Sequence, residues 1–212
     1  MKETLAKMER FGVIPVAVLD RKEDACPMAQ ALCDGGLPVA EITFRTAAAE
    51  RSIAQIAKEF PAMCVGAGTV LHVEQAERAV AAGAQFIVSP GFSKEIVDYC
   101  IQQKVPVFPG AVTPSEVMQI VDAGLEVVKF FPAEPMGGLS AIKAIAAPFP
   151  MLRFMPTGGI NDKNIRAYLE DPKIIACGGS WMVKKDLIMD RETEKIKQMT
   201  SDIVSLVKEV RG

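Results

Sequence analysis

The strongest constraint on the fold is a repeat in which short apolar segments alternate with longer amphipathic ones. The apolar segments are rich in Val, Ile and Phe and are bounded by Gly or Pro, which is typical of β-strands. Eight strands are predicted, at residues 13–19, 39–43, 63–65, 86–88, 105–108, 127–131, 152–155 and 174–177. They recur at roughly even intervals, as expected if each repeat is one strand and one helix.

The segments between these strands carry the signals of helices. Residues 47–60 are amphipathic, and residues 192–211 place an apolar stripe on one side of a long helix. Thr113 and Glu116 form a capping-box pair around Pro114, which predicts a helix start at that point. Glycines at 35, 83 and 124 are expected to end three other helices before the next strand begins.

Eight strand–helix units without an interrupting linker predict one α/β domain spanning residues 1–212, a (β/α)8 TIM barrel. An open, doubly wound parallel sheet is the alternative, because it is built from the same units. We favour the barrel because eight units fill so short a chain, with a helix on every crossover.

Composition excludes several classes of function. The chain has 24 Lys and Arg against 26 Asp and Glu, without a long run of either sign, so we expect neither a nucleic-acid partner nor a membrane. A basic patch formed only on folding stays possible. Five scattered cysteines without a C-x-x-C pair, and a start without a signal peptide, predict a cytoplasmic protein without a zinc site. His72 is the single histidine and begins a predicted helix, so no metal site is expected.

Charged residues inside two predicted strands are the best candidates for chemistry. Alternation along the strand at 39–43 puts Glu41 on the face opposite to Ala40 and Ile42, so it should point into the barrel. The same argument turns Lys129 inward near the end of its strand. A desolvated neutral amine is a nucleophile, and active sites of this fold lie at that end of the strands. A purely structural Lys129–Glu41 ion pair is the alternative.

Glycine-rich turns follow several strands. Those at 157–159 and 178–180 follow the last two strands, where many barrels bind phosphate with backbone N–H groups. Ordinary turn chemistry is the alternative. The Gly-Ala-Gly-Thr stretch at 66–69 lacks the last glycine of a dinucleotide fingerprint because Leu71 stands there, so no nucleotide cofactor is expected.

Several motifs, in order, carry a resemblance to a known family. They are Glu-Ile-Thr-Phe-Arg-Thr (41–46), Gly-Ala-Gly-Thr-Val (66–70), Ser-Pro-Gly (89–91), Val-Lys-Phe-Phe-Pro-Ala-Glu (128–134), Pro-Thr-Gly-Gly-Ile (156–160) and Gly-Gly-Ser-Trp (178–181). Together they resemble the 2-keto-3-deoxy-6-phosphogluconate (KDPG) and 4-hydroxy-2-oxoglutarate (KHG) aldolase family. Residues 111–114 differ from the wording common in that family, at the edge of the substrate pocket.

The resemblance implies a class I aldolase that uses neither metal nor cofactor and is commonly a homotrimer. Lys129 falls on the Schiff-base lysine and Glu41 on the general acid/base. Arg45 and Thr69 fall around the pyruvate carboxylate. Other pocket positions fall on Pro90, Phe131 and Thr157, and the phosphate end on Gly158, Gly159, Gly179 and Ser180.

The expected reaction splits KDPG into pyruvate and glyceraldehyde 3-phosphate, with KHG cleaved to pyruvate and glyoxylate as a second activity. A sugar-phosphate isomerase or epimerase is one alternative, since it would share the barrel and the phosphate turns without needing Lys129. A barrel that only binds a phosphorylated metabolite is the other.

Overall fold

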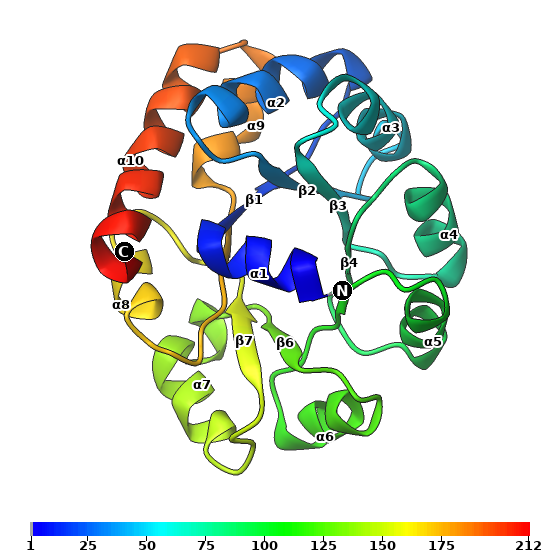
Figure 1. Ribbon diagram of the computed structural model, residues 1–212, viewed down its shortest axis with the longest axis vertical. Helices are drawn as coiled ribbons and strands as arrows, with labels where there is room; N and C mark the ends of the chain where they lie inside the picture. The colour runs from blue at the N-terminus through cyan, green and yellow to red at the C-terminus, as the bar shows by residue number, and fades with distance from the viewer. Residues whose placement is uncertain (1) are drawn as a thin grey trace.

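A computed structural model describes residues 2–212, in which strands and helices alternate along the chain (Figure 1). Each strand runs parallel to the strands with which it pairs. The strands described are β1 (Val13–Ala17), β2 (Val39–Thr43), β3 (Cys64–Gly68), β4 (Ile87–Val88), β5 (Val107–Phe108), β6 (Val127–Phe130), β7 (Arg153–Pro156) and β8 (Cys177–Gly179).

Helices follow every strand and lie around the outside of the sheet, while the first helix crosses one end of it (Figure 1). The α-helices are α1 (Lys2–Phe11), α2 (Ala25–Asp34), α3 (Ala49–Glu59), α4 (Val73–Ala81), α5 (Lys94–Gln102), α6 (Pro114–Asp122), α7 (Gly138–Ala146), α8 (Ile165–Leu169), α9 (Lys185–Met189) and α10 (Thr193–Arg211). Short 3₁₀ helices are η1 (Lys22–Asp24), η2 (Glu134–Met136) and η3 (Trp181–Val183). The predicted strand–helix alternation is therefore confirmed.

Six strands form a curled parallel sheet in the order β5-β4-β3-β2-β1-β8, and β6 pairs with β7 separately. Single bridges join the two sheets, from Gly110 to Lys129 on one side and from Thr157 to Gly178 on the other. In a doubly wound sheet the strand order reverses at a switch point. Strands β1 to β5 instead neighbour one another in chain order, which contradicts the doubly wound alternative.

Two predicted strands were wrong because glycine was interpreted as turn. The strand predicted at 63–65 continues through Gly66 to Gly68 as β3, and the one predicted at 174–177 lies later, as β8. A Cβ on Gly66 would lie 2.4 Å from the Phe86 ring, and one on Gly179 would lie 1.8 Å from Trp181. Glycine in these strands therefore makes room for a neighbouring ring. The other strands agree with prediction within two residues at each end.

The predicted helix signals are confirmed. Thr113 Oγ1 accepts a hydrogen bond from the Glu116 N–H and the Glu116 carboxylate accepts from the Thr113 N–H, so the capping box is formed. The hydrogen bond from the Val112 N–H is the largest cause that lowers the pKa of Glu116. Gly83 and Gly124 end their helices with positive φ. Gly35 is the C-cap of α2, and the next residue, Gly36, adopts the left-handed conformation with φ +86°.

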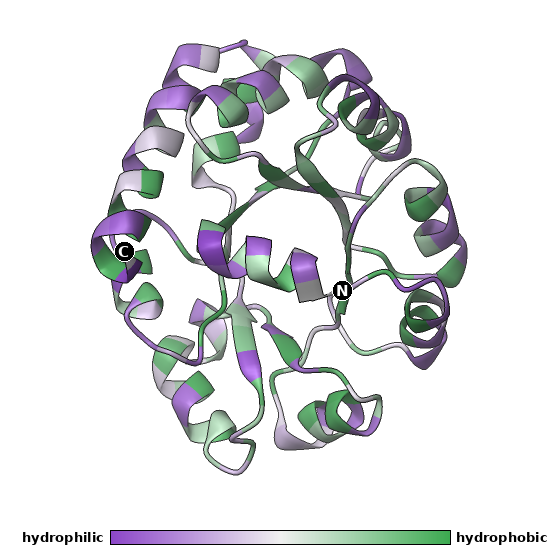
Figure 2. Ribbon diagram, in the orientation of Figure 1, coloured by the Kyte–Doolittle hydropathy of each residue, from purple (hydrophilic) through white to green (hydrophobic). Residues whose placement is uncertain are grey.

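The core lies between the strands and the helices that surround them. In Figure 2 the strands are mainly hydrophobic and the helices carry polar residues on part of their surface. Phe86 and Phe108 meet edge to face with ring centroids 6.2 Å apart, and both rings are buried. A continuous apolar core of this kind fixes the strands so that a few polar side chains can be placed between them.

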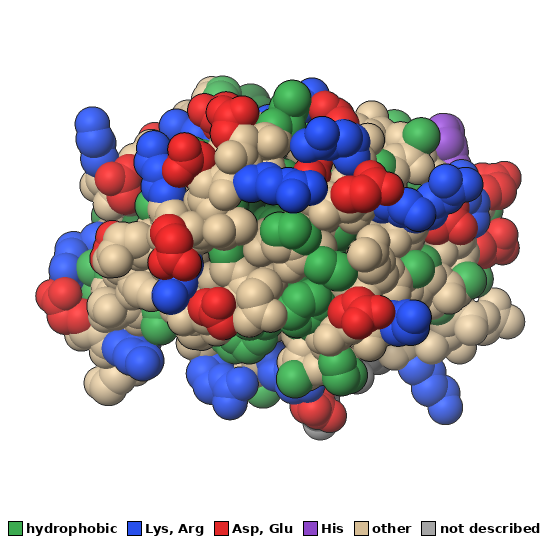
Figure 3. All heavy atoms as spheres, turned by 90° about the horizontal axis from the view of Figure 1, so that it is seen from above, with side chains coloured by type: hydrophobic (Ala, Val, Ile, Leu, Met, Phe, Trp, Pro, Cys, Tyr) green, Lys and Arg blue, Asp and Glu red, His purple; other side chains and the backbone are tan. Residues whose placement is uncertain are grey.

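The surface shows mixed charge on the face seen in Figure 3, where Lys and Arg side chains lie among Asp and Glu side chains. Within residues 2–212, no helix combines the length and apolar character that crossing a membrane requires.

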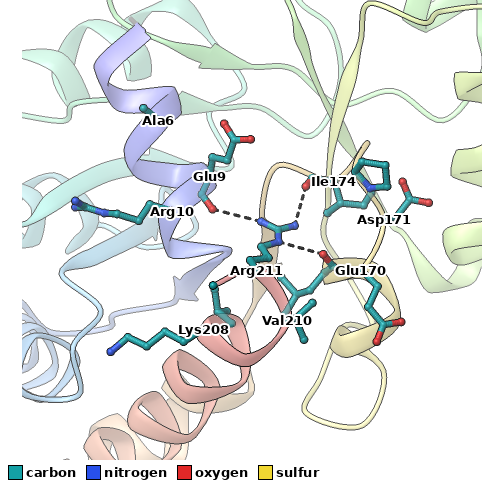
Figure 4. Close-up of a pocket in the computed structure, with 13 residues that line it drawn as sticks. Ala6, Glu9, Arg10, Glu170, Asp171, Ile174, Lys208, Val210 and Arg211 are labelled. Atoms are coloured by element: carbon teal, nitrogen blue, oxygen red, sulfur yellow. Dashed lines mark hydrogen bonds between the residues drawn. The ribbon is translucent and has the colours of Figure 1, made fainter.

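An arginine near the end of the chain holds the segment that leads into β8. Arg211 in α10 donates to the carbonyl oxygens of Ile174 and Ile175 at 2.8 and 2.9 Å, and to that of Leu169 at 3.1 Å. It also donates to the Glu9 carbonyl at 3.3 Å, so one guanidinium joins α1, α8 and the approach to β8 (Figure 4). The ladder with β1 begins at Cys177, because its partner Val13 is the first residue of β1.

We expect Arg211→Lys to lower the free energy of unfolding by about 2 kcal/mol. The lysine ammonium cannot donate to all the backbone carbonyls that surround the Arg211 guanidinium. Urea denaturation measures this change. Arg51→Lys, at an exposed position of α3, is the control and should leave the midpoint unchanged. Equal midpoints for both variants would contradict the structural role of Arg211.

Candidate active site

Glu41 and Lys129 meet in the interior between the strands. Glu41 lies in β2 and is 2% exposed, and Lys129 lies in β6 and is 5% exposed. Lys129 Nζ is 3.7 Å from Glu41 Oε1, so the two charges are paired. The structure thus brings together the two residues that alternation turned inward. A carboxylate this close can exchange a proton with the amine once a small side-chain movement brings the two atoms to hydrogen-bond distance, about 2.6–3.2 Å.

Gly68 makes room for the Glu41 side chain. It lies in β3, which pairs with β2 along its whole length. A Cβ on Gly68 would lie 1.9 Å from Glu41 Oε1 and 2.5 Å from its Cγ and Cδ. Any side chain at this position would therefore displace the whole carboxylate. The glycine interpreted from sequence as part of a turn is part of the wall around Glu41.

Lys129 is held by neighbours on both sides of β6. Its backbone pairs with Met155 in β7 and bridges to Gly110 after β5. Its Nζ lies 5.1 Å from the centroid of the half-buried Phe131 ring. The ring and the adjacent strands restrict the amine to the region where Glu41 lies.

Arg45 and Thr69 form a second polar pair, at the ends of β2 and β3. Arg45 Nε donates to Thr69 Oγ1 at 3.3 Å, and Arg45 is exposed. Thr69 has φ +55°, which is unusual for a β-branched residue and costs about 1–3 kcal/mol. The Thr69 hydroxyl is therefore held beside the Arg45 guanidinium by a strained backbone conformation.

A cleft of about 310 Å³ lies beside this pair. Its lining includes most of the residues predicted for the substrate pocket: Arg45, Phe131, Thr157, Gly158, Gly159, Gly179 and Ser180. Ser180 is exposed, and Gly179 is buried against the Trp181 ring, so Trp181 packs beneath the turn. The buried Thr157 Oγ1 has no hydrogen-bond partner within the described residues.

Within residues 2–212, the lining of this cleft does not include the other predicted site residues, Glu41, Thr69, Pro90 and Lys129. Lys129, Glu41 and Thr69 belong to the two polar pairs described above. Pro90 is half-buried and its carbonyl lies against Gly110, where a Cβ would approach it to 2.0 Å. Gly110 therefore lies between Pro90 and Lys129, because it also bridges to Lys129.

Seven residues that line the cleft were not among the predicted site residues. They are Gly178, the apolar residues Val16, Val18, Ile160 and Val183, and the charged residues Lys184 and Lys185. Lys185 Nζ lies 2.6 Å from Asp20 Oδ2. Two adjacent lysines shortly after the 178–180 turn were a signal that could have been used. The valines carried no such signal, because valine is common in any strand or core.

Other candidate nucleophiles are less suited to chemistry. Burial raises the pKa of the Cys64 thiol to about 11 and those of Cys100 and Cys177 to about 12. These thiols are neutral near pH 7, and the thiolate is the reactive form. His72 caps α4 at its N-terminus and is exposed, without a capping hydrogen bond from its side chain.

A larger hollow of about 700 Å³ lies between α1, α8 and α10, around Arg211 (Figure 4). The Arg211 guanidinium is occupied by backbone carbonyls. Lys129 and Glu41 do not line it. The paired buried charges and the unpartnered Thr157 hydroxyl instead favour the smaller cleft and its surroundings as the active site.

Comparison with known sequences assigns the family. A sequence model described as KDPG and KHG aldolase matches residues 5–199. A Treponema pallidum protein named 2-dehydro-3-deoxy-phosphogluconate aldolase is 45% identical over 200 residues, which is 94% of this chain and 95% of the relative. The KHG/KDPG aldolase of Escherichia coli is 44% identical over 192 residues, 91% and 90% of the two chains.

Solved structures agree with this assignment. A KDPG aldolase from Legionella pneumophila, with pyruvate captured as a covalent carbinolamine intermediate, superposes with a TM-score of 0.91 and 39% identity over 94% of this chain and 97% of that one. An aldolase of Zymomonas mobilis with 3-phosphoglycerate gives a TM-score of 0.83 at the same identity and coverage. The chain therefore belongs to the KDPG and KHG aldolase family.

Proposed function

We propose that this chain is a class I aldolase that cleaves KDPG into pyruvate and glyceraldehyde 3-phosphate. We include KHG as a second substrate, cleaved to pyruvate and glyoxylate. The observation that carries the proposal is the buried pair of Lys129 Nζ and Glu41 Oε1 at 3.7 Å. The covalent pyruvate intermediate of the Legionella relative supports it.

Lys129 forms the covalent bond in this mechanism. The Lys129 ammonium first passes a proton to the Glu41 carboxylate, and the neutral amine then attacks the C2 ketone of the substrate and gives a carbinolamine. Glu41 transfers the protons that allow the C2 hydroxyl to leave as water, which produces a protonated imine. The imine then accepts the electron pair released when a neighbouring carbon–carbon bond breaks. The mechanism uses this imine as its electron sink, without a metal or a cofactor.

Glu41 also acts in the cleavage step. As a carboxylate it takes the proton of the C4 hydroxyl, the C3–C4 bond breaks, and C4 leaves as the aldehyde carbon of glyceraldehyde 3-phosphate. The electron pair of that bond forms the enamine of pyruvate. Protonation at C3 and hydrolysis of the imine then release pyruvate and restore Lys129. An acid/base group of this kind contributes about 10²–10⁴-fold to the rate.

The rest of the pocket orients the substrate. Arg45 and Thr69 bind the carboxylate next to C2, since a guanidinium matches a carboxylate with two donors. Pro90, Phe131 and Thr157 enclose the pyruvate part. Gly158, Gly159, Gly179 and Ser180 bind the phosphate through backbone N–H groups and a hydroxyl. The 3-phosphoglycerate in the Zymomonas relative supports a phosphorylated substrate.

The proposal extends to the architecture of the protein. We propose that the eight strands close into one (β/α)8 barrel and that residues 1–212 act as one domain. The bridges from Gly110 to Lys129 and from Thr157 to Gly178 support closure, because they join both edges of the six-stranded sheet to the β6–β7 pair. The family resemblance implies a homotrimer, and the scattered cysteines favour a cytoplasmic location.

Lys129→Arg should reduce pyruvate release from KDPG to background, because arginine keeps the positive charge beside Glu41 but does not form the imine. Glu41→Gln should lower kcat about 10²–10⁴-fold. Both rates are followed through pyruvate formation, with Lys58→Arg, at an exposed position, as the control. If Lys129→Arg kept the wild-type kcat, an isomerase or a binding protein would be the better interpretation.

Gly68→Ala should fold and yet lower kcat about 10²-fold, because the added methyl displaces the Glu41 carboxylate by an ångström or more. The matched control is Gly91→Ala, since a Cβ there has no atom within 4 Å. Steady-state kinetics and thermal unfolding are measured for both variants. Wild-type kcat in a folded Gly68→Ala protein would show that the position of Glu41 does not limit the rate.

A further inference from the structure

Two asparagines that take no part in the proposed chemistry hold the turn at the phosphate end. Asn161 and Asn164 follow β7, and both Nδ2 groups donate to the Gly159 carbonyl, at 3.1 and 3.0 Å. Asn164 Oδ1 accepts from the Asn161 N–H at 2.8 Å, and Asn161 Oδ1 accepts from the Lys163 N–H at 2.9 Å. The two amides therefore form a closed clamp on one carbonyl group.

The preceding carbonyls of the same turn are held from the other side. Thr157 O accepts from the Ala133 N–H at 2.8 Å, and Gly158 O accepts from the Glu134 N–H at 3.0 Å. The Thr157 N–H donates to the Phe130 carbonyl, but no hydrogen bond within residues 2–212 uses the N–H groups of Gly158, Gly159 or Ile160. Three successive N–H groups therefore stay available to an anion.

Holding a carbonyl also fixes the N–H on the other side of the same peptide plane. Because the peptide unit is planar, the clamp on Gly159 O sets the direction of the Ile160 N–H. The bonds from Glu134 and Ala133 set the Gly159 and Gly158 N–H groups in the same way. Gly158 and Gly159 both have positive φ, +99° and +82°, so this segment has unusual backbone freedom to restrain.

We infer that Asn161 and Asn164 are positioning residues that preorganise the N–H groups of residues 158–160 for the substrate phosphate. They thereby set the preference for a phosphorylated over an unphosphorylated substrate. This inference rests on the proposed function, because it assigns the distal end of the same cleft. Neither asparagine touches the reacting carbons, so their effect is confined to substrates that carry the phosphate.

The test compares KDPG with KHG, which lacks the phosphate. Asn164→Ala should raise the KM for KDPG about tenfold, since about 1.4 kcal/mol of preorganised hydrogen bonding is a factor of ten. The kcat/KM for KHG should stay within about twofold of wild type. Asn161→Ala should give a smaller effect in the same direction, because the second hydrogen bond it loses comes from the Lys163 N–H, farther from the turn, whereas Asn164 also holds the Asn161 N–H. Asp162→Glu, an exposed change in the same loop, is the control.

Inorganic phosphate gives a second readout that needs no turnover. It should raise the thermal midpoint of the wild-type protein and of Asp162→Glu more than that of Asn164→Ala. Equal losses on KDPG and KHG, or unchanged kinetics on both, would overturn the inference. Absence of pyruvate release from both substrates with the wild-type protein would instead remove the proposed function, and the phosphate measurement would still decide the role of the clamp.

Discussion

The structure depends on burying a carboxylate and an ammonium side by side. Taking either charge out of water alone costs several kcal/mol, so Glu41 and Lys129 are tolerable inside the sheet only as partners. Their 3.7 Å separation requires β2 and β6 to be held across the interior from each other. It also requires a residue without a side chain at Gly68. The proposed chemistry uses this pair, in which a base lies beside a nucleophilic amine.

Glycine serves different purposes at the two ends of the cleft. Gly68 in β3 has no side chain and so leaves space for Glu41. Gly179 in β8 leaves space for the Trp181 ring in the same way. At the phosphate end, Gly158 and Gly159 adopt positive φ. That freedom has to be restrained from outside, by the backbone of the segment after β6 and by two asparagine amides. Residues 129–134 therefore contribute both Lys129 and the Ala133 and Glu134 N–H groups that hold the phosphate turn.

Much of the fold and of the polar centre could be predicted from sequence, because both follow from local rules. Short apolar runs bounded by Gly or Pro predicted the strands, and alternation along two of them turned Glu41 and Lys129 inward. What sequence reasoning missed depends on distant contacts. Gly66–Gly68 was interpreted as turn because the Phe86 and Glu41 side chains that need the space lie elsewhere in the chain. β8 was placed too early for the same reason, because Gly178 was interpreted as turn and the Thr157 side chain that needs its space lies elsewhere in the chain.

The central claim, that Lys129 forms an imine with pyruvate, is tested most directly by trapping. The protein is incubated with pyruvate and sodium borohydride, digested, and its peptides are mapped by mass spectrometry. The account predicts one reduced pyruvate adduct, on the peptide that contains Lys129, and none in Lys129→Arg. A folded wild-type protein without an adduct, or with the adduct on another lysine, would contradict it.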